Sequence, residues 1–226
     1  MIATVPKVEP TMDEHRTISS AAALLADPTR AEMLLVLMDG RSFPASDLAA
    51  RAHVSNPTAS HHLAMLVEAG FVEVVQQGRH RYHRLSNPKI AELIESLGVV
   101  ARFRSGVDEH PLAPGRSCYN HLAGKLGVHL RTSLESQGVI CQMAGAYAVT
   151  SDGMTFLRDL GVEETGVSGK ACLDWTERVP HVGGGLGRTL FQALLDKGWL
   201  RRGDVPRQVC LSEAGQSRFY EAFPIR

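Results

Sequence analysis

The sequence predicts a mainly α-helical protein of the α+β class that is divided into two domains. Apolar residues recur at helical spacing in several segments, whereas a short run rich in β-branched residues follows Gly70, as a β-hairpin strand does. The segment "RSGVDEHPLAPGRS", residues 104–117, has two prolines, two glycines and no apolar periodicity, which marks a boundary. A chain of 226 residues is long enough for two cores. We expect a flexible arm over 1–17, a first domain over 18–104, a linker over 105–117 and a second domain over 118–226.

The first domain is predicted to begin with a helix from about Ile18, followed by a second helix in "DPTRAEMLLVLMDG". Asp27 suits the N-cap of that second helix, Pro28 suits its first turn, and Gly40 ends it. The pattern "SDLAARAHV" then predicts a shorter helix that turns at Val54 into the next element.

The stretch "SNPTASHHLAMLVEAG" predicts a helix with one buried face and one polar face. Ser55 can cap it, and Gly70 can end it. Short hydrogen-bonding side chains near its start point away from the apolar stripe. With the preceding helix this makes a helix-turn-helix, whose second helix can read base edges in a major groove. The polar positions are Asn56, Thr58, Ser60, His61 and His62.

A β-hairpin is predicted next, in "FVEVVQQGRHRYHRL", with its turn at Gln77-Gly78. The whole chain has 24 basic and 24 acidic residues, so its net charge gives no sign of a nucleic-acid partner. The segment Gly78–Leu85, however, holds three arginines and two histidines without an acid. Arg79 and Arg81 beside the turn are suited to phosphate contacts, which give position and salt-dependent affinity. The domain is therefore predicted to be a winged helix-turn-helix.

The motifs of this domain resemble those of the ArsR/SmtB family of bacterial transcriptional repressors. The resemblance covers roughly residues 18–104 and lies in Asp-Pro-x-Arg, Ser-x-x-x-x-Ser-x-His-Leu, the Glu-Ala-Gly stop and the Gly-Arg-x-x-Tyr wing. It implies a homodimer formed by the first and last helices of the domain, a double-stranded DNA operator, and release of DNA when an effector binds. On this chain it assigns DNA contact to Asn56, Thr58, Ser60, His61 and His62, and to Arg79 and Arg81 of the wing.

The metal sites that the resemblance would imply are missing from this domain. Where the arsenic-sensing type carries cysteines, the chain reads "SFPASDL", and the helix "PKIAELIESLGVVARF" has no histidine for the zinc-sensing type. Without those ligand types neither site can hold its metal. The effector, a small molecule or a metal, is therefore expected to act elsewhere, and its identity is left open.

The second domain is predicted to be α+β and to contain a winged-helix-like unit. A helix is expected over 118–136, in "CYNHLAGKLGVHLRTSLES". "YAVTSDGMTFLRDL" and "QVCLSEAGQSRFYEAF" both run from a strand through Thr/Ser-x-x-Gly into a helix, with Thr150 and Ser212 as N-caps. Between them, "GRTLFQALLDKGWLRRGDVPRQVCL" has the order helix, glycine, strand, turn, strand, as in the first domain.

All four cysteines lie in this second half, and two of them have a histidine nearby in the sequence. Cys118 and His121 would share one face if their segment were helical, and Cys172, Asp174 and His181 lie in "ACLDWTERVPH". Two thiols and two imidazoles could hold zinc or another thiophilic metal, although the spacing is no standard zinc signature. A thiol redox switch and simple core cysteines are the alternatives.

Enzymatic activity is not expected. The glycines of "HVGGGLGRTL" match neither the dinucleotide fingerprint nor the phosphate loop, so we interpret them as allowing close helix packing. The alternative function is a winged-helix module that binds proteins and no DNA. The chain has no run of about 20 apolar residues and no signal-peptide core near its start, so a cytoplasmic protein without a membrane partner is expected.

Overall fold

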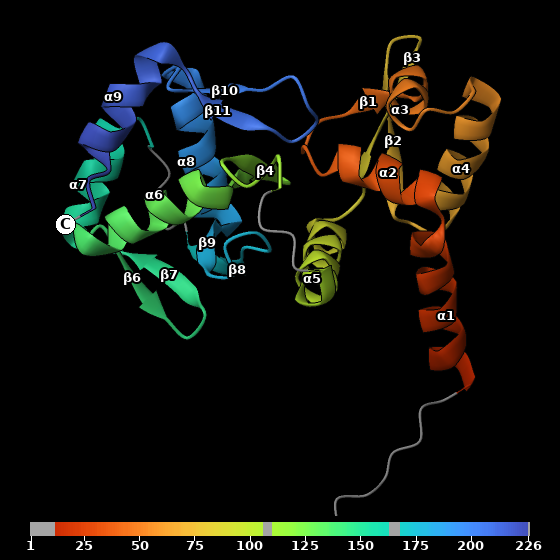
Figure 1. The fold of residues 1–226 in the computed structure, drawn as a ribbon, viewed down its shortest axis with the longest axis horizontal. Coiled ribbons are helices and arrows are strands. Elements are labelled where there is room, and N and C mark those ends of the chain that lie inside the picture. The colour runs from red at the N-terminus through yellow and green to blue at the C-terminus, as the bar shows by residue number, and fades with distance from the viewer. Residues whose placement is uncertain (1–11, 106–109, 163–167, 226) are drawn as a thin grey trace, which may run out of the picture. The chain divides into compact units, whose positions relative to one another are not determined.

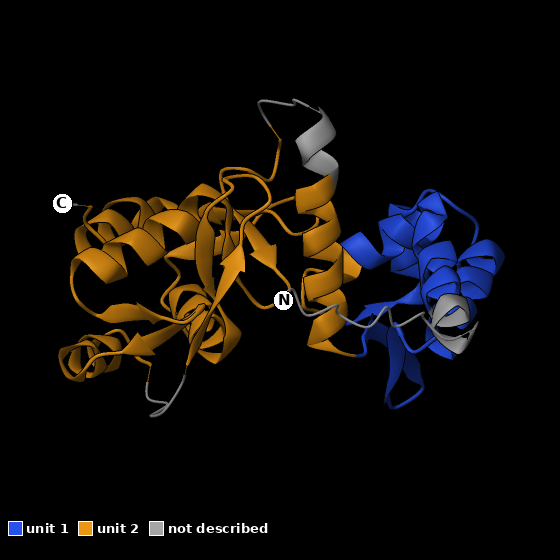
Figure 2. Cartoon of the chain, turned by 90° about the horizontal axis from the view of Figure 1, so that it is seen from below, with its two compact units in different colours: residues 1–35, 42–86 blue, residues 36–41, 87–226 orange. Residues whose placement is uncertain are grey.

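The computed structural model describes residues 12–105, 110–162 and 168–225, and the chain forms two compact units (Figures 1 and 2). Unit 1 comprises residues 1–35 and 42–86, and unit 2 comprises residues 36–41 and 87–226. The division thus falls at residue 86 rather than in the predicted linker, and helix α5 (Pro88–Ser105) belongs to unit 2. The reason is a buried carboxylate on α5, Glu95, which is paired with Arg116 and Arg207 of the same unit.

Unit 1 is a winged helix-turn-helix, as predicted. Its helices are α1 (Met12–Ala26), α2 (Pro28–Leu37), α3 (Ala45–Arg51) and α4 (Asn56–Glu68). The last two residues of α2 belong to unit 2. Its antiparallel sheet has the order β1-β3-β2, with β1 (Phe43–Pro44), β2 (Val72–Gln77) and β3 (His80–Leu85). The short strand β1 was not predicted. Helix α1 begins at Met12, so the predicted arm over 1–17 is wrong for residues 12–17, and its residues 1–11 lie outside the described chain.

Local capping signals set the helix starts in unit 1. The carboxylate of Asp27 accepts a hydrogen bond of 2.9 Å from the backbone N–H of Arg30, and the hydroxyl of Ser55 accepts one of 3.3 Å from that of Thr58. Both side chains satisfy N–H groups that a helix start leaves without partners. The apolar face of α4 is buried, which fixes the helix against the rest of unit 1.

Removing the cap of α4 should measurably weaken unit 1. Because Ser55→Ala leaves the N–H of Thr58 without its side-chain acceptor, we expect a loss of about 1 kcal/mol in the free energy of unfolding. Thermal melting followed by circular dichroism would measure it. Ser60→Ala is the matched control, because the exposed Ser60 hydroxyl makes no hydrogen bond within the described chain and its loss should change little. Equal melting temperatures for the two variants would contradict the capping role.

Unit 2 continues from α5 with the element order strand, strand, helix, strand, strand, helix, which occurs twice. The first repeat holds β4 (Arg116–Cys118), β5 (His121–Ala123), α6 (Gly124–Ser136), β6 (Ile140–Met143), β7 (Ala146–Val149) and α7 (Ser151–Asp159). The second holds β8 (Gly169–Leu173), β9 (Pro180–Gly183), α8 (Gly184–Asp196), β10 (Leu200–Arg202), β11 (Val209–Leu211) and α9 (Glu213–Ala222). A leucine-rich core with Phe219 and Phe223 joins them. The predicted winged-helix-like order is therefore present in both repeats.

The repeats share close backbone approaches at corresponding glycines. Segments 121–140 and 181–200 align without a gap. The equivalent glycines Gly127 and Gly187 each lie where a helix packs closely against the strand before it. A Cβ atom on Gly127 would lie 2.5 Å from the carbonyl oxygen of Leu122, and one on Gly187 would lie 2.2 Å from that of Val182. The glycines of "HVGGGLGRTL" thus permit close helix packing, as interpreted from the sequence.

Two equivalent pairings connect the repeats. Strand β7 of the first repeat joins β8 of the second, with Ala146 opposite Lys170, in the sheet of order β6-β7-β8-β9. In the same manner Gln208, just before β11, bridges to Arg116 of β4. In each case the second hairpin of one repeat is bonded to the first hairpin of the other repeat. The contacts between the two repeats are therefore equivalent in both directions.

The predicted helix over 118–136 is wrong for its first residues. Cys118 and His121 lie on strands β4 and β5, and α6 begins only at Gly124. Tyr119 in the hairpin turn has φ 61°, and Gly124 has φ +75°, so neither continues a right-handed helix. The predicted N-caps are confirmed: the hydroxyls of Thr150 and Ser212 each accept a hydrogen bond of 2.9 Å from a glycine N–H three residues later.

Candidate DNA interface and candidate metal centre

The polar face of α4 is open to solvent at the start of the helix. Asn56, Thr58, Ser60 and His61 are exposed, whereas Leu63 on the opposite face is buried. No Lys, Arg, Asp or Glu occurs in α4 before its last residue, so the face offers hydroxyl, amide and imidazole groups. Such groups can contact base edges when a helix lies in a major groove.

His62 differs from its neighbours on α4. Its side chain is only 15% exposed, and its Nδ1 lies 3.7 Å from a carboxylate oxygen of Asp27 and 3.5 Å from a guanidinium nitrogen of Arg30. These contacts hold the ring against the start of α2. Its position favours an anchoring role for His62 over a direct DNA contact, so the other four positions are the stronger candidates.

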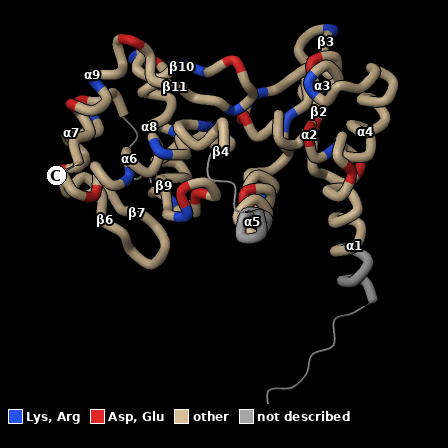
Figure 3. The backbone as a smooth tube through the Cα atoms, viewed as in Figure 1, with Lys and Arg blue, Asp and Glu red and all other residues tan. Residues whose placement is uncertain are grey.

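The wing carries exposed arginines. Arg79 lies in the turn between β2 and β3 and Arg81 lies on β3, where Figure 3 shows basic residues at the tip of the hairpin. Neither side chain takes part in an ion pair with any residue that the structure describes. Arg84 differs, because its Nε lies 2.5 Å from a carboxylate oxygen of Glu73 on the neighbouring strand. Arg79 and Arg81 thus keep their charge available for phosphates.

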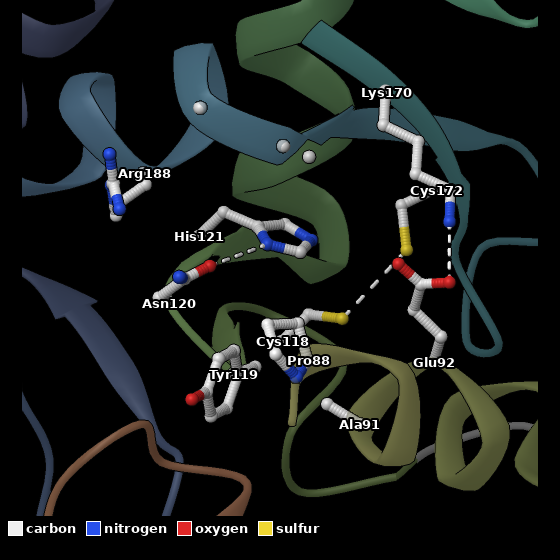
Figure 4. Close-up of a pocket in the computed structure, with 13 residues that line it drawn as sticks. Pro88, Ala91, Glu92, Cys118, Tyr119, Asn120, His121, Lys170, Cys172 and Arg188 are labelled. Atoms are coloured by element: carbon white, nitrogen blue, oxygen red, sulfur yellow. Dashed lines mark hydrogen bonds and ion pairs between the residues drawn. The ribbon is translucent and has the colours of Figure 1, made fainter. Parts of the chain in front are cut away.

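In unit 2, the structure brings together the two cysteines and two histidines that the sequence singles out. Cys118 and His121 are directly opposite each other in the hairpin of β4 and β5, and Cys172 and His181 are opposite each other in that of β8 and β9. One potential ligand atom from each residue lies within 4.8 Å of the other three. Three of the side chains are buried and Cys172 is half-buried. Figure 4 shows the two thiols directed at each other.

Both imidazole rings direct the same nitrogen into this Cys/His cluster. The Nε2 atoms of His121 and His181 are 3.0 Å apart. On the outer side, Nδ1 of His121 lies 3.4 Å from the side-chain oxygen of Asn120. Nδ1 of His181 lies 3.1 Å from a carboxylate oxygen of Asp174, although its N–H is not aimed squarely at that oxygen. Each ring is therefore oriented by an oxygen outside the cluster.

Asp174 is fixed by a buried polar network. One of its carboxylate oxygens accepts hydrogen bonds from the guanidinium of Arg116 at 3.0 Å and from the hydroxyl of Thr176 at 2.7 Å. The other accepts a bond of 2.7 Å from the backbone N–H of Gly124. Arg116 also lies 3.4 Å from the carboxylate of Glu95 on α5. The network thus runs from the cluster to α5 entirely within unit 2.

The electrostatics of the cluster favour one thiolate. The hydrogen bond with Cys172, together with burial, raises the pKa of the Cys118 thiol well above its ordinary value. The same contact lowers the pKa of Cys172 against the effect of burial, and both imidazoles lower it further. Burial lowers the pKa of His121, whereas for His181 burial is outweighed by Asp174 and Cys172, which raise its pKa. Burial also acts to raise the pKa of Asp174, but His181 and Arg116 hold it well below its usual range.

The cluster is reached from a cavity of about 270 Å³ in unit 2. Cys118, His121 and Cys172 line it, so three of the four side chains face accessible space (Figure 4). Glu92 of α5 and Lys170 of β8 also line it and form an ion pair of 2.6 Å. An ion or a small molecule therefore has a route to the cluster.

Comparison with known proteins identifies the chain. Residues 25–75 match a family model described as a helix-turn-helix domain. An uncharacterized HTH-type transcriptional regulator, YdfF of Bacillus subtilis, is 37% identical over 214 residues, which are 89% of this chain and 95% of that protein. The arsenical resistance operon repressor of Staphylococcus aureus is 28% identical over 86 residues, covering 38% of this chain and 82% of the repressor. The chain belongs to the ArsR/SmtB family. It is accordingly a DNA-binding transcriptional regulator.

Among solved structures, the winged helix-turn-helix domain of Mb0332 from Mycobacterium bovis, described as a possible ArsR-family regulator, is 22% identical with a TM-score of 0.40. The match covers 47% of this ArsR/SmtB chain and 97% of the Mb0332 domain. The Bacillus relative, by contrast, is matched through both units of the chain. Of the helices in the described residues, none is sufficiently long and apolar to span a membrane.

Sequence reasoning missed the residues that support the candidate metal centre of this ArsR/SmtB protein. Arg116 and Glu95 lie far from the cysteine motifs along the chain and carry no local signal of a role. Asp174 was singled out from the sequence together with Cys172 and His181, but it was given no supporting role.

Proposed function

We propose that the protein is a repressor that binds an inverted-repeat operator as a homodimer and responds to an effector. The observation that carries the proposal is the pairing, within unit 1, of an exposed polar face at the start of α4 with exposed arginines on the wing. The helix face suits base edges and the wing suits phosphates. In this proposal Asn56, Thr58, Ser60 and His61 specify sequence, and His62 positions α4.

The proposed dimer draws support from apolar side chains that each unit leaves exposed. On α5 these are Leu93, Leu97 and Val100, at the i, i+4, i+7 spacing of one helical stripe, with Val100 65% exposed. On α1, Ile18 is 70% exposed. A stripe of this kind is usually covered by a partner. The first and last helices of an ArsR-type domain are the elements that the family resemblance assigns to dimer formation.

The wing arginines test the DNA-binding part of the proposal. Replacing Arg79 and Arg81 together by alanine removes two phosphate-binding charges, so we expect the slope of log affinity against log salt to fall by about two. Affinity should fall on every DNA sequence. Fluorescence anisotropy with the operator and with unrelated duplex DNA, over a range of salt concentrations, would measure both effects.

Arg158→Ala with Arg218→Ala is the matched control, since it removes the same charge from exposed positions on α7 and α9. We expect it to leave the salt slope unchanged. His61→Ala should instead alter which operator sequence is preferred. If neither the wing variant nor His61→Ala changes retention of duplex DNA, the winged helix serves as a protein-interaction module and the proposed contacts are wrong.

A further inference from the structure

The Cys/His cluster of unit 2 has no part in the DNA contacts proposed above. We propose that Cys118, His121, Cys172 and His181 form a tetrahedral site for a thiophilic divalent metal ion of the zinc class. This goes beyond the proposed function and does not depend on it, because every residue concerned lies in unit 2.

The distances within the cluster fit one central ion. An ion with metal–sulfur bonds of about 2.3 Å and metal–nitrogen bonds of about 2.05 Å, in tetrahedral geometry, places two sulfurs about 3.8 Å apart and two nitrogens about 3.3 Å apart. The sulfurs of Cys118 and Cys172 are 3.9 Å apart, and the Nε2 atoms of His121 and His181 are 3.0 Å apart. These two distances thus match a tetrahedral site to within a few tenths of an ångström, and all four atoms lie within 4.8 Å of one another.

The surroundings of the histidines match those of metal ligands. A ligating imidazole binds the metal through one nitrogen and usually directs the other at a carboxylate or carbonyl oxygen. His181 has the carboxylate of Asp174 on its outer side, and His121 has the side-chain oxygen of Asn120. Asp174 is in turn held by Arg116 and by backbone N–H groups, so the carboxylate beside His181 is in place before any ion arrives.

The two alternative roles of the cysteines account for less of this arrangement. A disulfide between Cys118 and Cys172, whose thiols lie 3.9 Å apart, would use the two sulfurs but give the two histidines no role. Neither a disulfide nor a core thiol requires two imidazoles with their Nε2 atoms facing each other in the interior. Burial of such groups is unfavourable unless they are satisfied, and a shared metal ion satisfies all four at once.

The repeats explain why no zinc signature is visible in the sequence. Each repeat supplies one cysteine and one histidine that are opposite each other in its first hairpin, and the length of the turn between them differs. Spacing along the chain therefore reflects two different turns, while the spatial arrangement is equivalent. The cavity that Cys118, His121 and Cys172 line gives the ion a path of entry.

Metal analysis of the full-length, reduced protein, purified without chelator and then equilibrated with Zn²⁺, tests the site. We expect about one zinc ion per chain, and with Co²⁺ an absorption spectrum with thiolate-to-cobalt charge transfer and the strong bands of tetrahedral cobalt. Cys118→Ser with Cys172→Ser should reduce the bound metal to about zero. His121→Gln alone should keep the thiolate bands but weaken binding at least about tenfold.

Cys141→Ser with Cys210→Ser is the matched control, because it removes two thiols of unit 2 that lie outside the cluster. This variant should bind zinc like the unaltered protein. Folding of every variant is checked by circular dichroism. The proposal is overturned if the reduced, folded protein takes up no stoichiometric metal, if its cobalt spectrum is octahedral, or if the Cys118/Cys172 variant retains the metal.

Discussion

Arg116→Leu should lower the free energy of unfolding of unit 2 by about 3–5 kcal/mol, because it leaves two buried carboxylates without their shared partner. The guanidinium of Arg116 is fully buried, lies 3.0 Å from Asp174 and 3.4 Å from Glu95, and stacks over Trp175 at 4.8 Å. Leucine fills much of the volume but supplies no charge. Denaturant unfolding followed by tryptophan fluorescence would report on unit 2 alone, since both tryptophans, Trp175 and Trp199, belong to it.

Lys170→Met is the control for this change. Lys170 also forms an ion pair in unit 2, with Glu92 on α5, but the two side chains are about half exposed, at 52% and 47%. Surface pairs of this kind contribute at most about 1 kcal/mol. Equal losses for the Arg116 and Lys170 variants would contradict the view that burial of the network makes Arg116 essential to unit 2.

Gly215→Ala should be nearly as damaging, for a steric reason. A Cβ atom at Gly215, in the first turn of α9, would lie 1.9 Å from the backbone carbonyl oxygen of Trp199. Because backbone rather than a flexible side chain is in the way, α9 must move, and we expect a loss of about 3 kcal/mol in stability. The first repeat has the same approach, where a Cβ at Gly153 would lie 2.1 Å from the carbonyl oxygen of Val139.

Gly198→Ala separates steric conflict from backbone strain. Gly198 has φ +66°, which disfavours alanine, but, its chain neighbours aside, no atom of the described residues lies within 4 Å of the position of its Cβ. We expect a loss of about 1–2 kcal/mol for this variant. Thermal unfolding of the two variants side by side would measure the difference. A Gly198 variant less stable than the Gly215 variant would contradict the steric account.

Features of the fold that depend on neighbouring residues were predictable from the sequence. The caps at Asp27, Ser55, Thr150 and Ser212 were found because a capping side chain and the N–H that it satisfies stand three residues apart. The start of α6 could not be predicted, because the left-handed turn at Tyr119 depends on tertiary contacts. A Cβ on Gly40 would lie 2.2 Å from the carbonyl oxygen of Tyr119, so a distant segment of the chain closes over that turn.

The two candidate sites also differ in how far local sequence predicts them. The DNA-facing positions of α4 and the wing followed from periodicity and charge, which are local. The ligand types of the cluster could also be chosen from the sequence, but their convergence could not, since it depends on contacts between residues of two β-hairpins more than fifty residues apart. Of the side chains that hold the cluster, Asp174 stands near Cys172 and His181 in the sequence, whereas Arg116 is recognisable only by the burial of its charge.

The division of the cluster between two repeats has an evolutionary consequence. One repeat alone offers a single cysteine and a single histidine, which is half of a tetrahedral ligand set. A substitution at the cysteine or histidine of either repeat therefore breaks the proposed ligand set as a whole, so relatives that contain both repeats should keep or lose Cys118, His121, Cys172 and His181 together.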